Sequence, residues 1–266
     1  MYIIRLMRVW VGTGPSLAVA LLLAAACGNP LGRQYEYEEQ FYLAIDGSAT
    51  IILNASVPAL VALRGVPIDP APSARTDRDD VRRLFESGGC DVVRVGQPWR
   101  RRGRRFVQVR LRTADVRTLG ACKWLGWSTV QLENVGEMVH YRHIVGPPAG
   151  ADPGTPKWEG SEIVAFKLHL PSRILDHNFK LLADGSNAEV ERGNILTSEQ
   201  RLADRLSGKP IEMDVTMGAE SILYQTLGLF AGAFLAAVAL LTTIVWLVVS
   251  KGRRQKATKY VARTGL

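Results

Sequence analysis

An arginine run directly after Trp99 is the densest group of one kind of side chain in this sequence. Its members are Arg100, Arg101, Arg102, Arg104 and Arg105. A guanidinium group donates two parallel hydrogen bonds to a phosphate or carboxylate, and several such groups at one turn repel one another unless an anion compensates. The run predicts contact with an anionic lipid headgroup, a glycolipid or an acidic partner, and an indole favours the headgroup level of a membrane. The alternative is a solvated hairpin tip that keeps a sheet edge soluble.

Cys90 and Cys122 supply a second kind of chemistry. A cysteine pair in an oxidising compartment is typical of a disulfide, which would stabilise the domain by roughly 3 to 4 kcal/mol in the chain-entropy model. The small residues at 88–89 and 120–121 also permit two buried free thiols. Spacing alone leaves both alternatives open.

Cys27 follows a segment with the order of a secretory signal. Arg5 and Arg8 precede a short apolar core at 17–23 and three alanines at 24–26, which predicts a signal peptide over residues 1–26. Cleavage before Cys27 resembles bacterial lipoprotein processing, in which the new N-terminal cysteine receives lipid. That pattern prefers leucine three residues before the cysteine, where this chain has alanine. Ordinary signal peptidase cleavage and an uncleaved signal anchor are the alternatives.

A second apolar segment lies near the C-terminus and contains no charged residue from Ile222 to Val249. A bilayer core about 30 Å thick needs roughly 20 apolar helical residues, so we expect a transmembrane helix over 221–250. Six basic residues and no acid follow in 251–266. Because basic residues stay on the cytoplasmic side, this predicts a single-pass protein of a bacterial cytoplasmic membrane, with its N-terminal domain outside the cytoplasm and a basic tail inside.

Small residues recur every four positions in the expected span, at Gly228, Gly232 and Ala236. They share one helical face and would let two backbones approach closely, which predicts a homodimer through this helix. The alternative is that small residues are simply frequent in such helices.

The net charge of +8 is a consequence of this topology. Two basic residues belong to the signal region and six to the tail, and the remaining 25 are balanced by 25 acidic residues between positions 28 and 221. The domain outside the membrane is therefore neutral on average, and no nucleic-acid partner is expected. Its charge is uneven, since residues 75–117 contain 13 arginines and only six acids.

The residues between the two apolar segments predict an α+β fold with antiparallel β-hairpins and short helices. Asp46 and Gly47 suit a tight hairpin turn, and Gly103 suits a second one inside the arginine run. In the first part, residues 27–146, the expected strands are 35–45, 48–55, 91–95, 106–112, 129–133 and 138–145, and the expected helical segments are 77–86 and 114–119.

Residues 147–160 are interpreted as a linker, because proline and glycine are too frequent there for packing. The membrane-proximal segment 161–220 that follows is also expected to be α+β. Its expected elements are strands at 162–170, 188–192 and 211–217 and a helix at 198–206. These strands either complete the sheet of the first part or form a separate small subdomain.

Four features of the chain together resemble the LppM-like bacterial membrane lipoproteins. They are a processed Cys27, an early hairpin turn of Asp46-Gly47-Ser48, a late strand running into Leu170-Pro171 and Asn178, and a single C-terminal span with a basic tail. The resemblance implies a cell-envelope α+β domain that binds lipid or glycolipid. It carries no catalytic residue across.

Local motifs of enzyme chemistry are missing from the sequence. There is no Gly-x-Ser-x-Gly elbow, no phosphate loop and no His-Glu-x-x-His. His140 and His143 are three apart on an expected strand, so they point to opposite faces and would not share a metal ion. We therefore expect a protein that is not an enzyme and that uses no metal or cofactor.

Two classes of function remain. The first is a non-catalytic envelope protein whose membrane-anchored domain binds lipid, glycolipid or another envelope component. The second is an accessory or scaffold subunit of an inner-membrane complex that acts through its transmembrane helix. Replacing the span with an unrelated one distinguishes them, because only the second class should lose function.

Overall fold

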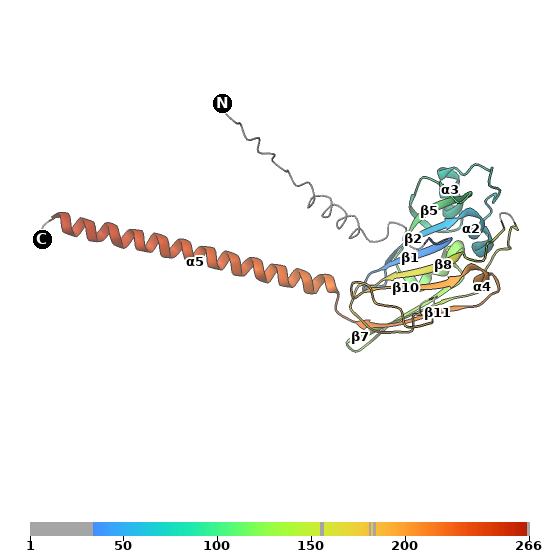
Figure 1. The fold of residues 1–266 in the computed structure, drawn as a ribbon. Coiled ribbons are helices and arrows are strands. Elements are labelled where there is room, and N and C mark those ends of the chain that lie inside the picture. Colours follow the sequence, from blue (N-terminus) through green and yellow to red (C-terminus); the bar gives the residue numbers. More distant parts are fainter. Residues whose placement is uncertain (1–33, 155–156, 181, 183–184, 265–266) are drawn as a thin grey trace, which may run out of the picture. The chain divides into compact units, whose positions relative to one another are not determined.

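The computed structural model describes residues 34–154, 157–180, 182 and 185–264. The signal peptide predicted over 1–26 and the lipidation predicted at Cys27 lie outside these residues. The described chain contains two β-sheets, several short helices and one long C-terminal helix (Figure 1). The predicted α+β class is confirmed.

The first sheet has seven strands in the order β10-β8-β1-β2-β5-β3, with β4 also paired to β5. Its strands are β1 (Tyr37–Leu43), β2 (Ala49–Ser56), β3 (Asp91–Val95), β4 (Trp99–Arg101), β5 (Arg104–Thr113), β8 (Ile163–His169) and β10 (Ile195–Arg201). The pair of β1 and β8 is parallel, and the other pairs are antiparallel. The predicted hairpin at Asp46-Gly47 joins β1 to β2.

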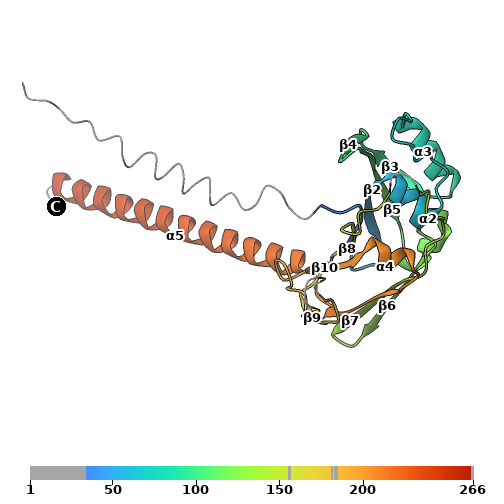
Figure 2. The ribbon, with the colours of Figure 1, turned by 45° about the vertical axis from the view of Figure 1, so that its right-hand side comes forward.

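The second sheet has four strands in the order β6-β7-β11-β9, all antiparallel. They are β6 (Ser128–Val135), β7 (Met138–Val145), β9 (Ile174–His177) and β11 (Ile211–Gly218). Its inner face packs on the first sheet, because the ring of His143 lies 5.0 Å from Phe41 and 6.1 Å from Phe166. Figure 2 separates the two layers, with β6, β7 and β9 on one side and β8 and β10 on the other.

Short helices cover the first sheet. Helix α2 (Val57–Arg64) begins after Ser56, whose Oγ accepts a hydrogen bond from the backbone N–H of Ala59, and it packs on β2 and β5. The predicted helix at 77–86 is present as α3 (Arg78–Ser87), with Asp77 as its N-cap. Two 3₁₀ segments, η1 (Val116–Ala121) and η2 (Lys123–Leu125), lead into β6.

Strands from both predicted parts share both sheets. β8 and β10 extend the first sheet beyond β1, while β11 and β9 extend the second sheet beyond β7. The helix predicted at 198–206 is confirmed over α4 (Leu202–Leu206) and wrong over residues 198–201, which belong to β10 and pair with β8. The strand predicted at 188–192 is not formed, and only Glu191 in this range makes an isolated bridge, to Ile195.

The stretch 147–160 packs on the domain over its described residues. The backbone N–H of Ala149 donates to the carbonyl of Leu63 at 3.0 Å, which satisfies one of the unpaired carbonyls at the end of α2. Gly150 lies against the same helix end, and the guanidinium of Arg104 lies 5.0 Å from the ring centre of Trp158. The expectation that proline and glycine prevent packing is therefore wrong here.

The C-terminal helix α5 (Ile222–Thr264) contains an apolar stretch, Thr226–Lys251, of 26 residues with a mean hydropathy of 2.4. Such a stretch is about 39 Å long, more than the hydrocarbon core of a bilayer requires. Tyr224 and Trp246 lie near its two ends, where aromatic residues favour the membrane interfaces. The chain thus has one helix long and apolar enough to span a membrane.

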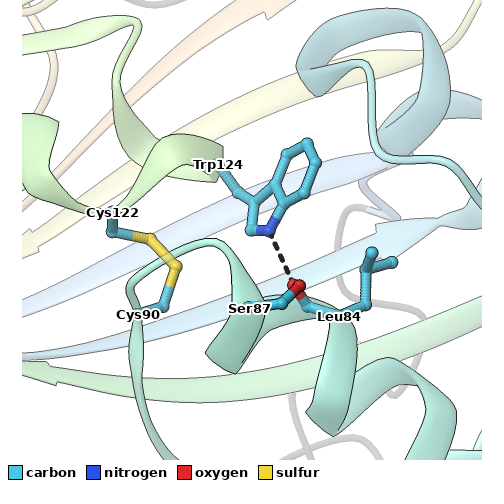
Figure 3. Close-up of a disulfide and its surroundings, with 5 residues drawn as sticks. All are labelled: Leu84, Ser87, Cys90, Cys122 and Trp124. Atoms are coloured by element: carbon cyan, nitrogen blue, oxygen red, sulfur yellow. Dashed lines mark hydrogen bonds between the residues drawn. A yellow bond between two sulfur atoms is a disulfide. The ribbon is translucent and has the colours of Figure 1, made fainter.

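Cys90 and Cys122 form a disulfide between the loop after α3 and the start of η2 (Figure 3). The indole of Trp124 lies beside it, and its Nε1 donates to the carbonyl of Leu84 at 3.1 Å. Gly88 is required at this contact, because an added Cβ would collide with the Trp124 ring. The disulfide and the indole together hold the end of α3 against the segment that leads into β6.

We expect the double variant Cys90→Ser/Cys122→Ser to lose about 3–4 kcal/mol of unfolding free energy, because the disulfide closes a loop with a sequence separation of 32. Urea unfolding of the full chain in detergent, followed by near-UV circular dichroism, measures the loss. Added reductant should destabilise the wild type and leave the double variant unchanged. Equal stability of the two proteins would contradict the prediction.

Candidate functional site

The arginine run divides into a buried part and an exposed part. Arg102 and Gly103 both have positive φ and form the two-residue turn between β4 and β5. Arg104 is buried and pairs with Glu36 at 3.1 Å and with Glu162 at 2.7 Å. Burial disfavours its charge, but these two carboxylates outweigh burial and raise the pKa of Arg104 above its usual value.

Arg105 and Arg101 are also engaged by the protein. Arg105 is buried and donates to Thr76 and to the backbone carbonyls of Asp69 and Ala71. The guanidinium of Arg101 lies 4.2 Å from the ring centre of Phe106 and donates to the carbonyl of Tyr35.

The expected anion contact is therefore corrected. Arg104 and Arg105 hold the fold together, and their terminal guanidinium nitrogens contact protein acceptors. Arg100 and Arg102 remain exposed, beside Trp99, whose ring stacks on Phe106 at 5.5 Å. An anion at this turn would meet two free guanidinium groups rather than five.

A second group of polar side chains is buried between the two sheets. Glu39 on β1 is fully buried, pairs with Arg64 at the end of α2 and accepts a hydrogen bond from the hydroxyl of Tyr37. The guanidinium of Arg64 lies 3.4 Å from the ring centre of Trp127, and that of Arg205 lies 5.0 Å from the same ring. The cluster connects β1, α2, α4 and the start of β6.

Burial controls the charge of this cluster. It lowers the pKa of Arg64 to about 9, so the guanidinium remains protonated at neutral pH beside the Glu39 carboxylate. It raises the pKa of Tyr37 to about 12 and, with the nearby charge of Arg64, lowers the pKa of His143 to about 3. The tyrosine and the histidine are neutral at physiological pH. The charged and titratable members of the cluster are buried, which is consistent with a structural role.

A cavity of about 360 Å³ lies on the outer face of the second sheet. Its volume is within the range of about 300–1,000 Å³ that is usual for small-molecule sites. Polar side chains from all four strands and the residue after β9 line it: Gln131, Glu133, His140, Arg142, Asp176, His177, Asn178, Asp214 and Thr216. Alternation along the strands explains the composition, because residues on the other face enter the core.

The register of the sheet orders these side chains in rows. His140 on β7 lies opposite Glu133 on β6 and Thr216 on β11, and Thr216 lies opposite Asp176 on β9. The hydroxyl oxygen of Thr216 is 3.2 Å from Nδ1 of His140. Two carboxylates, a hydroxyl and an imidazole therefore share one row across the sheet.

Asp214 is the best-fixed group in the cavity. Its carboxylate accepts a hydrogen bond from the side-chain amide of Asn178 at 3.1 Å and lies 3.6 Å from Nε of Arg142. Its backbone N–H donates to the side-chain oxygen of Asn178 at 2.9 Å. These contacts hold amide, carboxylate and guanidinium groups in fixed positions toward the cavity.

The mixture of groups favours a neutral, hydroxyl-rich ligand. Three carboxylates and one guanidinium line the cavity, which disfavours a bare phosphate. Carboxylates, amides and imidazoles accept and donate the hydrogen bonds that sugar hydroxyls require. The lining can therefore both donate hydrogen bonds to hydroxyl groups and accept them.

The sequence did not predict this cavity. Asn178 contributes only to the resemblance given above, and His140 was considered only as a metal ligand. As predicted from their spacing, His140 and His143 lie on opposite faces, with His140 at the cavity and His143 in the core. Among the described residues no three histidine, cysteine or acidic side chains are grouped closely enough to hold a metal ion.

The small residues of the predicted helix contact lie on α5. Gly228, Gly232 and Ala236 are exposed in the single chain. Homodimerisation through them stays a prediction.

Fold and site together define a mixed α+β protein with a polar surface cavity and one potential transmembrane helix. The sequence matches no family model and no curated protein sequence. The structure is similar to the NMR structure of the folded domain of LppM from Mycobacterium tuberculosis, with 11% sequence identity and a TM-score of 0.36. The similarity covers 71% of this chain and 94% of that domain. The resemblance to LppM-like lipoproteins that was stated from the sequence is thus supported only by a weak structural similarity.

Proposed function

We propose that this protein is a membrane-anchored, non-catalytic envelope protein that binds the sugar headgroup of a glycolipid in the cavity on its second sheet. The observation that carries the proposal is the cavity itself, with its nine polar side chains and the bonded pair of Asn178 and Asp214. The sequence lacks the local motifs of enzyme chemistry, which supports binding rather than catalysis.

The proposal includes a topology. The apolar stretch of α5 anchors the chain in a bacterial cytoplasmic membrane, and the basic residues in 251–266 favour a cytoplasmic C-terminus. The cavity would then lie outside the cytoplasm, on the side of the membrane where the outer leaflet is exposed. The disulfide supports this assignment, because disulfides persist outside the cytoplasm.

Thr216→Trp is expected to weaken glycolipid binding at least about tenfold, a loss of about 1.4 kcal/mol, because the indole would fill the cavity. Thr129→Trp is the matched control, since Thr129 is exposed on the same face of β6 but does not line the cavity. The full chain in detergent is incubated with total envelope glycolipids and analysed by native mass spectrometry.

The expected result is a glycolipid adduct on the wild type and on Thr129→Trp, and its loss on Thr216→Trp. Equal adducts on all three proteins would place binding elsewhere. Adducts of phospholipid alone would contradict the preference for a sugar headgroup and direct attention to Arg100 and Arg102.

A further inference from the structure

Three apolar side chains stand out on the surface of the domain. Leu175, Val135 and Met138 are 55%, 51% and 40% exposed, more than any other large apolar side chain of the described residues before α5. Isolated exposed apolar residues need no explanation, but a group of them at one place does.

These three side chains lie at one end of the second sheet. Val135 pairs with Met138 across the turn between β6 and β7, and Met138 lies opposite Gly218 at the end of β11. Leu175 follows Ile174, which pairs with Met217 on the other side of β11. We call Val135, Met138 and Leu175 the apolar rim, and it flanks the last residues of β11 on both sides.

The chain continues from the apolar rim directly into α5. Gly218 ends β11 and Ile222 begins α5, so three residues lie between them, and at most about 14 Å of extended chain separates their Cα atoms. Hydrogen bonds fix this junction. The backbone N–H of Ala219 donates to the carbonyl of Glu137 in the β6–β7 turn at 2.9 Å, and that of Gly218 donates to the carbonyl of Arg173 at 3.1 Å.

We propose that the apolar rim is a second membrane contact, which inserts into the headgroup and acyl boundary of the bilayer that α5 spans. The occupant is the lipid surface, because the rim is tied by backbone hydrogen bonds to a junction that leads into an apolar helix within four residues. Arg173 is exposed two positions before Leu175 and can donate to lipid phosphates at the same depth.

The contact orients the second sheet on the membrane. Val135 and Met138 lie on the same face of the sheet as Glu133 and His140, one row of the cavity away, which is about 7 Å along the strands. With the rim in the bilayer, the cavity is held at the level of lipid headgroups. The membrane contact itself does not depend on what the cavity binds.

Site-directed spin labelling of the full chain tests the proposal. A label is attached to Val135→Cys, Met138→Cys or Leu175→Cys in a Cys27→Ser background, where the disulfide leaves Cys90 and Cys122 unreactive. The protein is reconstituted in vesicles of phosphatidylcholine and phosphatidylglycerol. Thr129→Cys, at the other end of β6 on the same face, and Val93→Cys, on β3, are the controls, and all five positions are exposed.

The ratio of oxygen to nickel-chelate accessibility is expected to be several-fold higher at the three rim positions than at the two controls. The same accessibility at all five positions would overturn the proposal. A high ratio that persists in a soluble medium without lipid or detergent would also overturn it, because the labels would then be covered by protein. Glycolipid is absent from these vesicles, so the result is independent of the function proposed for the cavity.

Discussion

Replacing Arg64 with methionine is expected to lower the free energy of unfolding by about 3–5 kcal/mol, because it leaves the Glu39 carboxylate buried without its partner. Methionine retains an apolar chain of similar length against Trp127, so packing changes little. One carboxylate oxygen of Glu39 already lacks a hydrogen-bond partner. Among the described residues, Arg64 is the cation that forms an ion pair with this carboxylate. Urea unfolding of the full chain in detergent, followed by near-UV circular dichroism, measures the change.

Two further variants isolate the buried pair. Arg83→Met removes an exposed arginine that pairs with Asp80 on α3, and it should cost no more than about 1 kcal/mol. The double variant Glu39→Leu/Arg64→Met removes both charges and should recover most of the stability lost by Arg64→Met alone. A single variant as stable as Arg83→Met, or a double variant less stable than Arg64→Met, would contradict the assignment.

Local signals in the sequence predicted the elements that need no distant partner. Alternating residues with Asp46-Gly47 at the turn predicted β1 and β2, and the acids after Asp77 predicted α3. The uncharged apolar run predicted the potential transmembrane helix. Helix α2 was missed, although Ser56 and Pro58 are typical of a helix start and Gly65 of a helix end.

The role of each arginine in the run could not be predicted from composition. Arg104 is buried because the fold places Glu162, 58 residues later in the sequence, within hydrogen-bond distance of its guanidinium. Arg100 and Arg102 belong to the same run but remain exposed, and no acidic side chain of the described residues forms an ion pair with them. Alternation along a strand shows which residues share a face but not which acidic residues will lie opposite them.

The cavity was hidden for a related reason. Alternation in the predicted strands places Gln131, His140 and Asp214 on the polar faces of their strands. It does not reveal that these three strands are neighbours and that their polar faces form one surface of the same sheet. The pairing of β9 with β11 brings Asn178 to Asp214 across 36 residues, and only that register encloses the site. Tertiary pairing also placed residues 198–201, the first part of the helix expected at 198–206, in β10.

Gly150→Ala is expected to destabilise the domain by at least about 3 kcal/mol, because a Cβ at this position has no room. The added atom would overlap the carbonyl of Val61 and lie 2.7 Å from the nitrogen of Gly65 and 2.8 Å from the carbonyl of Ala62. All three are backbone atoms of the last turn of α2 and its cap, so no side chain can rotate to make space. Relief would require the chain to leave the helix end and break the hydrogen bond from Ala149 to Leu63.

Gly120→Ala is the matched control, because a Cβ there meets no atom within 4 Å and the backbone has no positive φ. Its effect should lie within about 0.5 kcal/mol of the wild type. Thermal unfolding of both variants in detergent compares them directly. If Gly150→Ala unfolds together with Gly120→Ala, the stretch after β7 moves freely as a linker, as the proline and glycine content alone would imply. A large loss confined to Gly150→Ala would instead identify this stretch as a strap that joins the end of α2 to the rest of the domain.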